Sequence, residues 1–395
     1  MNKSEVFIVS AARTPIGNFC GSLSSYKGSQ LGSLAIKAAL GRANVAPEDV
    51  SEVIMGQALV AGQGQNPARQ AAINAGIPYS VPACNVGMLC GSGMKALCLA
   101  YQAICCNEAE IVVAGGQESM TQAPHVIQMR NGVKMGKAEL TDSMLGDGLM
   151  CAFCNIHMGE TAENIAKQYS IKREEQDKFA EECQKKTEEA QSKHLFDKEI
   201  VPVNYTVGKE VKTLTKDEFP KSGVTMESLA KLRPVFLKDG GTVTAGNASG
   251  INDGAAAVVL VSEKKLKEKN LKPLAKVVGF SQAGIEPSVM GLGPVSAVKK
   301  LLEKIQWKIE DVDLFELNEA FAAQSLAVVK DLGVDMNKVN VNGGALALGH
   351  PIGASGCRIV VTLLHALEQR GKTKGVASLC IGGGMGIAMA VERCS

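Results

Sequence analysis

Residues 44–55 read Asn-Val-Ala-Pro-Glu-Asp-Val-Ser-Glu-Val-Ile-Met, and residues 306–317 read Gln-Trp-Lys-Ile-Glu-Asp-Val-Asp-Leu-Phe-Glu-Leu. Both stretches place Glu-Asp-Val directly before an apolar, strand-like run, and Asp311 follows Asp49 by 262 residues. Each stretch is preceded by a run with helical spacing of its apolar residues. Self-similarity at a fixed separation is the sequence signature of a repeated structural unit. The two stretches therefore predict that the chain contains a duplication.

A second pair of stretches supports the duplication. Residues 110–116 and 376–383 are apolar runs that end in Gly-Gly, and these glycines are separated by 267 residues. The second half continues into another apolar run, 385–391, and the matching run of the first half is 255–261. Because helical and strand patterns alternate, we predict two homologous α/β halves with mostly parallel strands.

The second strand run of the first half comes late, which indicates an insertion. We predict an N-terminal half over residues 1–120, completed by 250–272, an inserted loop domain over 121–249, and a C-terminal half over 273–395. In the insertion, residues 160–199 hold 11 acids and 8 bases with helical spacing, which predicts a solvated helix. Residues 205–238 hold seven Lys or Arg against four Asp or Glu. Such a stretch is usually a solvated face, and the alternative is a site for an anionic ligand.

Composition excludes several classes of protein. The chain has 395 residues, of which 46% are hydrophobic and 21% charged, so a folded globular protein is expected. A net charge of +2 argues against a nucleic-acid partner. No apolar run reaches the length of a membrane span. Neither end resembles a targeting peptide, so we expect a cytoplasmic protein.

The twelve cysteines are scattered along the chain, and we expect reduced thiols rather than a disulfide framework. Cys151-Ala152-Phe153-Cys154 spells a C-x-x-C pair. No second pair or histidine stands at ligand spacing, so we expect no metal site there.

Two loops carry a cysteine next to glycines. Cys90-Gly91-Ser92-Gly93 opens a helical run, and a thiol at a helix start is favoured as a thiolate and thus as a nucleophile. Cys380 ends an apolar strand run and precedes Gly382-Gly383-Gly384, whose free N–H groups suit an oxyanion. The alternative for either cysteine is a buried structural residue. Of the two, Cys90 is expected to be the more acidic.

Two further loops supply matching polar groups. Asn318 begins Asn-Glu-Ala-Phe at the end of a strand run, where ligand groups gather in α/β sheets, although a helix N-cap is an equal alternative. His350 lies within Gly349-His350-Pro351-Ile352-Gly353-Ala354-Ser355-Gly356, a run whose glycines let backbone approach a ligand. Gly-His-Pro alone is more often a surface turn, but here it joins three loops of related chemistry.

Together the four loops resemble the thiolase family, and the resemblance extends from residue 10 to the C-terminus. It includes His157-Met158-Gly159 and the stretch 244–254. It implies an α/β fold of duplicated layered halves, α/β/α/β/α, with an inserted loop domain. It also implies acetyl-CoA C-acetyltransferase activity in lipid metabolism, which condenses two acetyl-CoA into acetoacetyl-CoA and CoA. CoA is then substrate and product, no separate cofactor is needed, and a homotetramer is expected.

The resemblance also implies roles for individual residues. Cys90 takes the acetyl group, and His350 accepts the thiol proton. Cys380 removes the α-proton of a second acetyl-CoA and later reprotonates the departing CoA. His350 and a water fixed by Asn318 hold the enolate oxygen, whereas the N–H groups of Cys90 and Gly382 hold the tetrahedral oxyanion.

The same resemblance implies contacts to CoA. Lys221 stands where relatives often have Arg near the nucleotide, and Lys keeps the charge but loses the planar stacking surface. The residues expected along the CoA thioester are His157, Met158, Lys221, Phe236, Ser249, Met290 and Phe321.

Three other functions remain open. A degradative 3-ketoacyl-CoA thiolase of broader chain length carries the same residues. A ketoacyl-synthase-like enzyme pairs its cysteine with two histidines or with His and Asn, and Cys380 argues against it. A binding protein without activity is disfavoured because Cys90, Asn318, His350 and Cys380 are all present.

Overall fold

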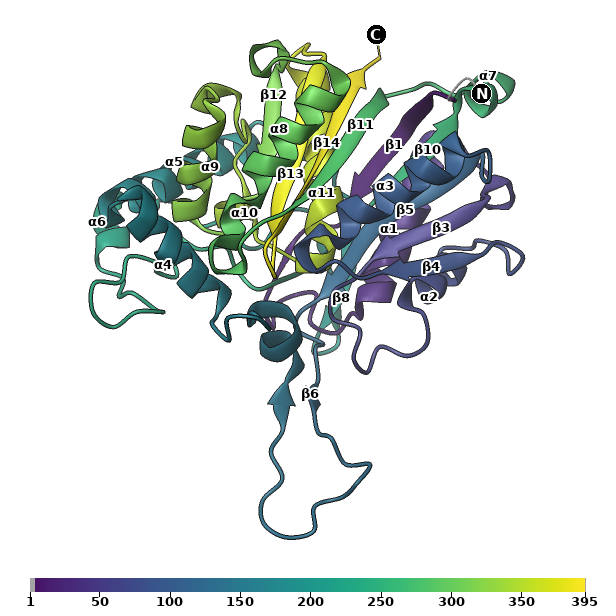
Figure 1. The fold of residues 1–395 in the computed structure, drawn as a ribbon. Coiled ribbons are helices and arrows are strands. Elements are labelled where there is room, and N and C mark those ends of the chain that lie inside the picture. Colours follow the sequence, from purple (N-terminus) through teal and green to yellow (C-terminus); the bar gives the residue numbers. More distant parts are fainter. Residues whose placement is uncertain (1–3, 395) are drawn as a thin grey trace.

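A continuous mixed sheet crosses the molecule and takes strands from both halves of the sequence (Figure 1). The computed structural model describes residues 4–394. The strand order is β12-β13-β14-β11-β1-β10-β5-β3-β4, with β2 (Gly17–Asn18) paired to β10. The strands of the first half are β1 (Val6–Arg13), β3 (Glu52–Gly56), β4 (Ala83–Val86), β5 (Ile111–Ser119) and β10 (Asn252–Ser262). Those of the second half are β11 (Ala275–Gly284), β12 (Leu314–Leu317), β13 (Lys374–Ile381) and β14 (Met385–Arg393).

The predicted duplication is confirmed element by element. In the first half α1 (Gly28–Ala43) ends at a left-handed residue, passes through a 3-10 turn, η1 (Pro47–Asp49), and enters β3. In the second half α8 (Gly293–Ile305) ends in the same way, passes through η5 (Ile309–Asp311), and enters β12. Strand β5 pairs with β10 just as β13 pairs with β14.

The prediction of mostly parallel strands is wrong. Only β4-β3-β5 and β12-β13 are parallel, and the other pairs of the large sheet are antiparallel. For β13 and β14 the reason is the length of the connection, because parallel neighbours need a long crossover whereas a short turn joins antiparallel strands. The glycine turn between Ile381 and Met385 is far too short for a crossover.

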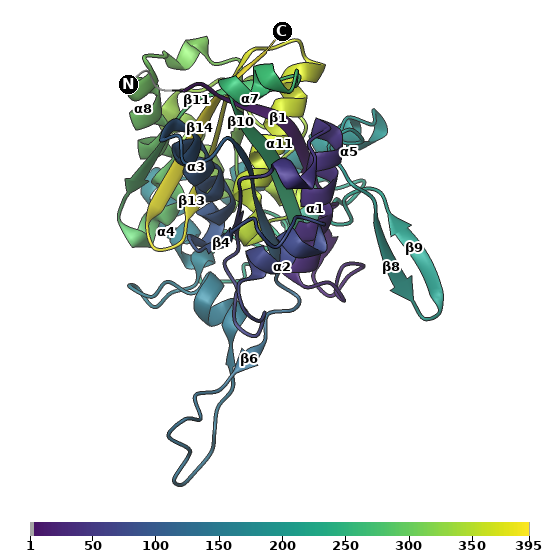
Figure 2. The same ribbon diagram turned by 90° about the vertical axis from the view of Figure 1, so that its right-hand side faces the viewer.

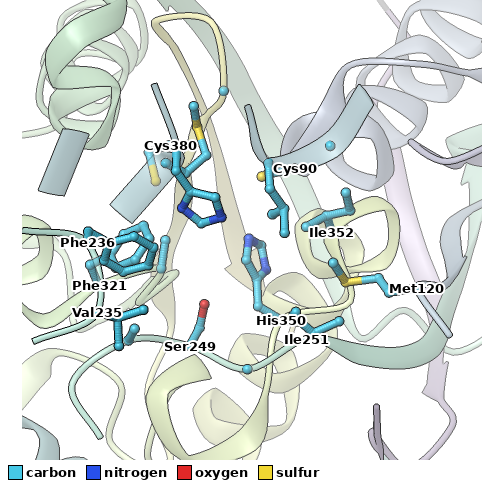
Figure 3. A pocket seen from close by; sticks show the side chains of 18 of the residues that line it. Cys90, Met120, Val235, Phe236, Ser249, Ile251, Phe321, His350, Ile352 and Cys380 are labelled. Carbon is cyan, nitrogen blue, oxygen red and sulfur yellow. The ribbon is translucent and has the colours of Figure 1, made fainter. Parts of the chain in front are cut away.

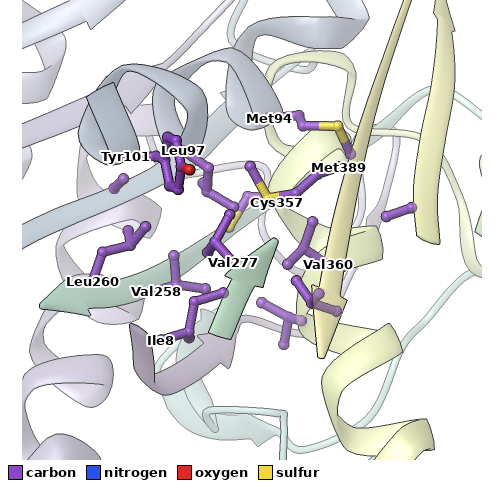
Figure 4. Close-up of a cluster of buried hydrophobic side chains, with 14 of the residues drawn as sticks. Ile8, Met94, Leu97, Tyr101, Val258, Leu260, Val277, Cys357, Val360 and Met389 are labelled. Atoms are coloured by element: carbon purple, nitrogen blue, oxygen red, sulfur yellow. The ribbon is translucent and has the colours of Figure 1, made fainter. Parts of the chain in front are cut away.

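Helices on both outer faces and between the halves complete the predicted α/β/α/β/α layers. α1 and α2 (Pro67–Asn74) cover the first half, and α8 and α9 (Ala322–Leu332) cover the second. Between them, α3 (Ser92–Cys105) packs against α11 (Ile352–Gln369). Figure 4 shows this central core, with Leu97 and Tyr101 of α3 beside Cys357 and Val360 of α11.

The two central helices approach each other closely. A Cβ atom on Gly356 would lie 2.5 Å from the backbone nitrogen of Met94, so only glycine fits at this contact. Because α3 follows the Cys90 loop and α11 follows the His350 loop, this packing brings two predicted site loops together.

The segment between β5 and β10 surrounds one end of the layers. The β6–β7 hairpin extends away from the body in Figure 1, and the β8–β9 hairpin projects in Figure 2. The elements of this segment are β6 (His125–Val126), β7 (Thr141–Asp142), the π-helical η3 (Met144–Leu149), α4 (Met158–Tyr169), α5 (Arg173–Ser192), β8 (Val203–Val207), β9 (Glu210–Leu214) and α6 (Met226–Ala230). The remaining short helices are η2 (Leu89–Gly91), α7 (Glu263–Glu268), η4 (Pro287–Leu292), η6 (Met336–Lys338) and α10 (Ala345–Leu348).

The charged stretch of this segment is helical, as predicted, but α5 is only partly solvated. It packs against α6, α9 and α10 and buries Phe179, Ala180 and Cys183. The prediction of a solvated helix rested on the number of charged residues. These residues lie on one side of the helix, so the other side is free to pack against the protein.

A buried ion-pair cluster joins this segment to the first strand. The guanidinium of Arg13 donates to Glu199 at 2.6 Å and to both carboxylate oxygens of Asp217 at 2.6 and 2.9 Å. All three side chains are buried. Removing one partner of such a cluster would leave an uncompensated buried charge, so it fixes the inserted segment to β1.

Within residues 4–394, no helix is long and apolar enough to cross a membrane. The same part of the chain holds no group of three or more His, Cys, Asp or Glu placed to bind a metal ion. Cys151 and Cys154 of the C-x-x-C pair pack with apolar side chains.

Candidate active site

Cys90 lies at a helix start, as the sequence predicts. It occupies the 3-10 turn η2 directly before α3. Ser92 fixes this turn, because its hydroxyl accepts from the N–H of Met88 at 2.8 Å and donates to the carbonyl of Leu89 at 2.7 Å. The backbone N–H groups of Cys90 and Gly382 lower the pKa of the Cys90 thiol. Two backbone donors thus act on the atom predicted to carry the acyl group.

Cys380 and the glycine turn lie at the end of β13. The thiol of Cys380 is buried and faces the cavity that Cys90 lines (Figure 3). Gly383 and Gly384 have φ values of +82° and +83°, and a Cβ atom on Gly384 would lie 2.4 Å from the carbonyl oxygen of Ile285. The turn therefore requires glycine, and it places the N–H of Gly382 at the Cys90 sulfur.

His350 lies just before α11 and faces the same cavity (Figure 3). Its backbone N–H donates to the side chain of Asn252 at 3.0 Å. Its Nδ1 lies 2.6 Å from Oγ of Ser355 and 3.4 Å from Nδ2 of Asn318. Its Nε2 is buried and makes no hydrogen bond to the described part of the chain. Nε2 is thus the ring nitrogen that lacks a partner in this part of the chain.

Asn318 lies behind His350 and does not line the cavity. It follows β12, and its backbone N–H donates to Ser378 at 3.0 Å. Its Oδ1 accepts from Arg358 at 3.4 Å, and its Nδ2 faces His350. The structure therefore brings Asn318 to the imidazole, and the water that Asn318 is expected to hold stays a prediction.

The cavity has a volume of about 320 Å³ and joins the predicted catalytic loops to the inserted segment. Cys90, His350, Cys380 and Gly382 line one part of it. Most of the predicted substrate contacts line the rest, namely His157, Met158, Phe236, Ser249, Met290 and Phe321. A mostly apolar cavity with a few convergent polar groups is the usual form of a ligand site.

Three rings build one wall of the cavity. His157 stacks on Phe236 with centroids 4.7 Å apart, and Phe236 meets Phe321 edge to face at 6.3 Å. His157 also caps α4, because its Nδ1 accepts from the N–H of Gly159 at 3.0 Å. Burial lowers the pKa of His157, so the neutral ring is favoured in this wall.

Lys221 does not line this cavity. It is exposed, its N–H donates to Gln184 at 3.2 Å, and its Nζ lies 6.0 Å from the ring centroid of Phe219. The structure therefore separates Lys221 from the other predicted substrate contacts.

Burial controls the protonation of the site. It raises the pKa of Cys90 to about 11, outweighing the N–H groups of Gly382 and Cys90, which lower it. It raises the pKa of Cys380 still further, with a smaller contribution from Cys90. Both shifts run against the thiolate that the helix start was expected to favour, and the larger one is on Cys380. Burial, with a smaller contribution from Arg358, lowers the pKa of His350 to about 3, so this ring is neutral.

Comparison with known proteins agrees with this geometry. The family model described as "Thiolase, N-terminal domain" matches residues 6–264, and "Thiolase, C-terminal domain" matches residues 271–393. The chain belongs to the thiolase family. The resemblance inferred from the four loops is thereby confirmed.

Individual thiolases match over almost the entire chain. Rat "Acetyl-CoA acetyltransferase, cytosolic" is 59% identical over 389 residues, covering 98% of both chains. The crystal structure of the Bacillus anthracis acetyl-CoA acetyltransferase is 45% identical, with a TM-score of 0.97 and 99% of both chains covered. Human mitochondrial 3-ketoacyl-CoA thiolase is 44% identical, with a TM-score of 0.96 and 99% of both chains covered.

The thiolase site contains polar residues that the sequence analysis missed. Glu118 is buried, accepts from the N–H groups of Ala58 and Gly353 at 2.9 Å each, and thus ties the first half to the His350 loop. Burial raises the pKa of Glu118 to about 8. Arg358 is buried in helix α11 and is the one charged residue of its stretch 352–364, which was the available signal.

Proposed function

We propose that this thiolase is an acetyl-CoA C-acetyltransferase, which condenses two acetyl-CoA molecules into acetoacetyl-CoA and CoA through an acetyl group carried on Cys90. The observation that carries the proposal is the single cavity shared by the two sulfurs of Cys90 and Cys380 and the imidazole of His350. The sequence identity with relatives named acetyl-CoA acetyltransferase supports acetyl-CoA as the substrate.

In the first half-reaction the Cys90 sulfur attacks the thioester carbonyl. The bond between sulfur and the acetyl carbon forms and the bond from that carbon to the CoA sulfur breaks. His350 accepts the Cys90 proton, and Cys380 gives its own proton to the departing CoA. The N–H groups of Cys90 and Gly382 both act on the Cys90 sulfur, and we assign them to hold the oxygen on the carbon that this sulfur attacks.

In the second half-reaction a second acetyl-CoA loses an α-proton, and its enolate carbon attacks the acetyl group on Cys90. Cys380 faces the same cavity and, being a thiolate once it has given its proton to the first CoA, removes this α-proton. The new carbon–carbon bond replaces the bond to sulfur, and the Cys90 sulfur takes back the proton held by His350. His350 holds the thioester oxygen on which enolate charge develops.

The cavity wall accommodates the arm of CoA. An extended apolar wall of His157, Met158, Phe236, Met290 and Phe321 suits the aliphatic part of a pantetheine chain, and Ser249 adds a polar side chain there. The anionic nucleotide then lies outside the cavity, where the exposed cation of Lys221 is available to it. CoA serves as substrate and product, and the reaction as written requires no other cofactor.

The enzyme is proposed to act in the cytoplasm as a homotetramer. The rodent relative's name supports the location. The β6–β7 hairpin supports assembly, because it extends from the body and exposes Met129, Met135 and Leu140 (Figure 1). Light scattering of the purified protein measures the mass of the assembly, and a monomer would contradict this proposal.

Thiolysis of acetoacetyl-CoA by CoA, followed spectrophotometrically, tests the activity. The wild-type protein should be active, and Cys90→Ser should lose both activity and the acetyl group that labelled acetyl-CoA leaves on the protein. Label on any other residue would contradict the assignment.

A degradative 3-ketoacyl-CoA thiolase is the alternative, and the human structural neighbour shows that the fold suits both. Rates with 3-ketoacyl-CoA of increasing chain length separate the two. A higher kcat/KM with long chains than with acetoacetyl-CoA would favour the degradative enzyme.

A further inference from the structure

Cys151 and Cys154 lie in one tight turn that the proposed reaction does not use. The N–H of Asn155 donates to the carbonyl of Cys151 at 2.8 Å, which closes a single helix-like turn around the pair. The N–H of Cys151 donates to the carbonyl of Ile156, also at 2.8 Å. In a turn closed in this way, Cα atoms three residues apart are about 5 Å apart. A disulfide needs about 4.4–6.8 Å between Cα atoms, so the backbone already has a suitable spacing.

The two thiols interact but differ in their access to solvent. Both are free thiols in this structure. Cys154 is partly exposed, whereas the Cys151 side chain is only 2% exposed. Desolvation raises the pKa of Cys154, and the neighbouring Cys151 thiol raises it further. Cys154 is therefore the thiol that a small reagent meets first, and Cys151 stands behind it.

The turn joins two segments that line the cavity. η3, before the turn, contributes Leu145 and Leu149, and His157 follows the turn directly at the start of α4. A bridge between Met150 and His157 holds the two ends of the turn together. A change in the turn is therefore transmitted to His157, whose ring stacks on Phe236 in the cavity wall (Figure 3).

The inner side of the turn packs against the cavity. Cys151 belongs to the same buried apolar cluster as Phe321 and Cys380. Between the two cysteines, Phe153 reaches the glycine turn, because a Cβ atom on Gly383 would lie 3.5 Å from Cε2 of its ring. Bonding the Cys151 sulfur to Cys154 would change its contacts within this cluster. Close-packed interiors transmit such a change to their neighbours, so the state of the pair is linked to the shape of the cavity.

We propose that Cys151 and Cys154 are a reversible disulfide site, oxidised by a low-molecular-weight disulfide, and that the closed form weakens binding of CoA thioesters. The modification goes beyond the proposed function, and only its effect on binding rests on that function. The resting enzyme carries the dithiol, as the structure does.

The reaction consists of two thiol–disulfide exchanges. Cys154 loses its proton and attacks one sulfur of the small disulfide, which forms a mixed disulfide and releases one small thiolate. Cys151 then loses its proton and attacks the Cys154 sulfur, which forms the internal disulfide and releases the second thiolate. The two released thiolates take up the two protons. The protein pair is thus oxidised by two electrons, and one small disulfide is reduced to two thiols.

Peptide mapping tests the modification. The native protein is treated with glutathione disulfide, its remaining thiols are alkylated, and it is digested with trypsin. The peptide 138–167 contains Cys151 and Cys154 and no other cysteine. It should resist alkylation, be lighter than the dithiol peptide by two hydrogen atoms, and take up two alkyl groups after reduction with dithiothreitol. Alkylation of both cysteines without reduction, or a link from either to Cys380 or to glutathione, would overturn the proposal.

Initial rates of acetyl-CoA condensation test the effect on binding. Oxidation of the wild type should raise KM for acetyl-CoA about tenfold, which is the scale of one lost methylene contact in an apolar pocket. The condensation direction is used because CoA, a substrate of thiolysis, is itself a thiol and would reduce the disulfide. A protein that carries the mapped disulfide but keeps the KM of the reduced enzyme would overturn the proposal.

Two variants separate this pair from the other thiols. Cys154→Ser cannot close the disulfide, so its KM should match that of the reduced wild type before and after treatment. Cys106→Ser is the matched control, because Cys106 is an exposed cysteine that does not line the cavity, and this variant should respond as the wild type does.

The variants also show where the reasoning fails. If treated Cys154→Ser loses as much as the treated wild type, oxidation acts elsewhere, for example at Cys90, and the proposal is wrong. An untreated wild-type enzyme without activity would instead contradict the proposed function, and peptide mapping would still decide whether the disulfide forms.

Discussion

Gly384→Ala provides a quantitative test of the glycine turn that follows Cys380. The substitution keeps every polar group, but the new Cβ atom would lie 2.4 Å from the carbonyl oxygen of Ile285 and 2.8 Å from the nitrogen of Pro287. Ordinary contact begins near 3.4 Å, so the two backbones must separate by about 1 Å. This movement would carry the neighbouring N–H of Gly382 away from the Cys90 sulfur.

The size of the effect follows from two contributions. A side chain at φ +83° costs about 1–2 kcal/mol, and the forced contact costs about 1–3 kcal/mol more. We therefore expect about 2–5 kcal/mol less stability. Because a displaced oxyanion donor costs about 10²–10³-fold in rate, kcat for thiolysis should fall by that factor while the protein remains folded.

The preceding glycine supplies a matched control. Gly383 has almost the same φ, +82°, but a Cβ atom there would meet only Phe153 at 3.5 Å, which is an ordinary contact. Gly383→Ala should therefore lose only about 1–2 kcal/mol of stability and less than about threefold in kcat. Thermal unfolding and acetoacetyl-CoA thiolysis of both variants, at one protein concentration, measure the difference. Equal losses of kcat in the two variants would refute the reasoning, since only Gly384 has the close backbone contact.

Cys380→Ser should spare part of the acetylation of Cys90 but stop the exchange of acetyl methyl protons with deuterated solvent, and undiminished exchange would show that another base operates. Lys221→Gln should raise KM for CoA thioesters more than it lowers kcat, with a smaller effect on a pantetheine thioester that lacks the nucleotide. Equal effects on both substrates would mean that Lys221 does not contact CoA. The alkylation rate of Cys90 by iodoacetamide should rise about tenfold per pH unit and level off near pH 11, because burial raises this pKa and only the thiolate reacts. A plateau below pH 9 would contradict a buried resting thiol.

The loops of Cys90, His350 and Cys380 could be selected from the sequence because each is marked by residues that are neighbours in the chain. Cys90, His350 and Cys380 each stand beside glycines in a short stretch, so residue type and neighbours were sufficient to select them. The duplication could be predicted for the same reason, because its turns and strands repeat as short patterns.

The rest depended on what packs against each residue. Strand direction was predicted wrongly because sequence patterns do not show which strands become neighbours. The partly buried face of α5 depends on contacts with α6, α9 and α10. The raised pKa of Cys90 reflects burial by several distant segments, and its helix-start position alone suggested the opposite. Arg358 contacts Asn318, which lies 40 residues away in the chain, so the sequence alone does not show this pairing.

The contact between the two central helices has a consequence for biosynthesis. Cys90 precedes α3 in the first half, whereas His350 and Cys380 come from the second, and the close approach of α3 and α11 is what joins them. A nascent chain therefore lacks the His350 imidazole, the Cys380 thiol and the Gly382 N–H beside Cys90 until the second half has been synthesised and has docked. On the proposed mechanism neither half holds the complete site, so the duplication that built the scaffold also makes catalysis a property of the finished protein alone.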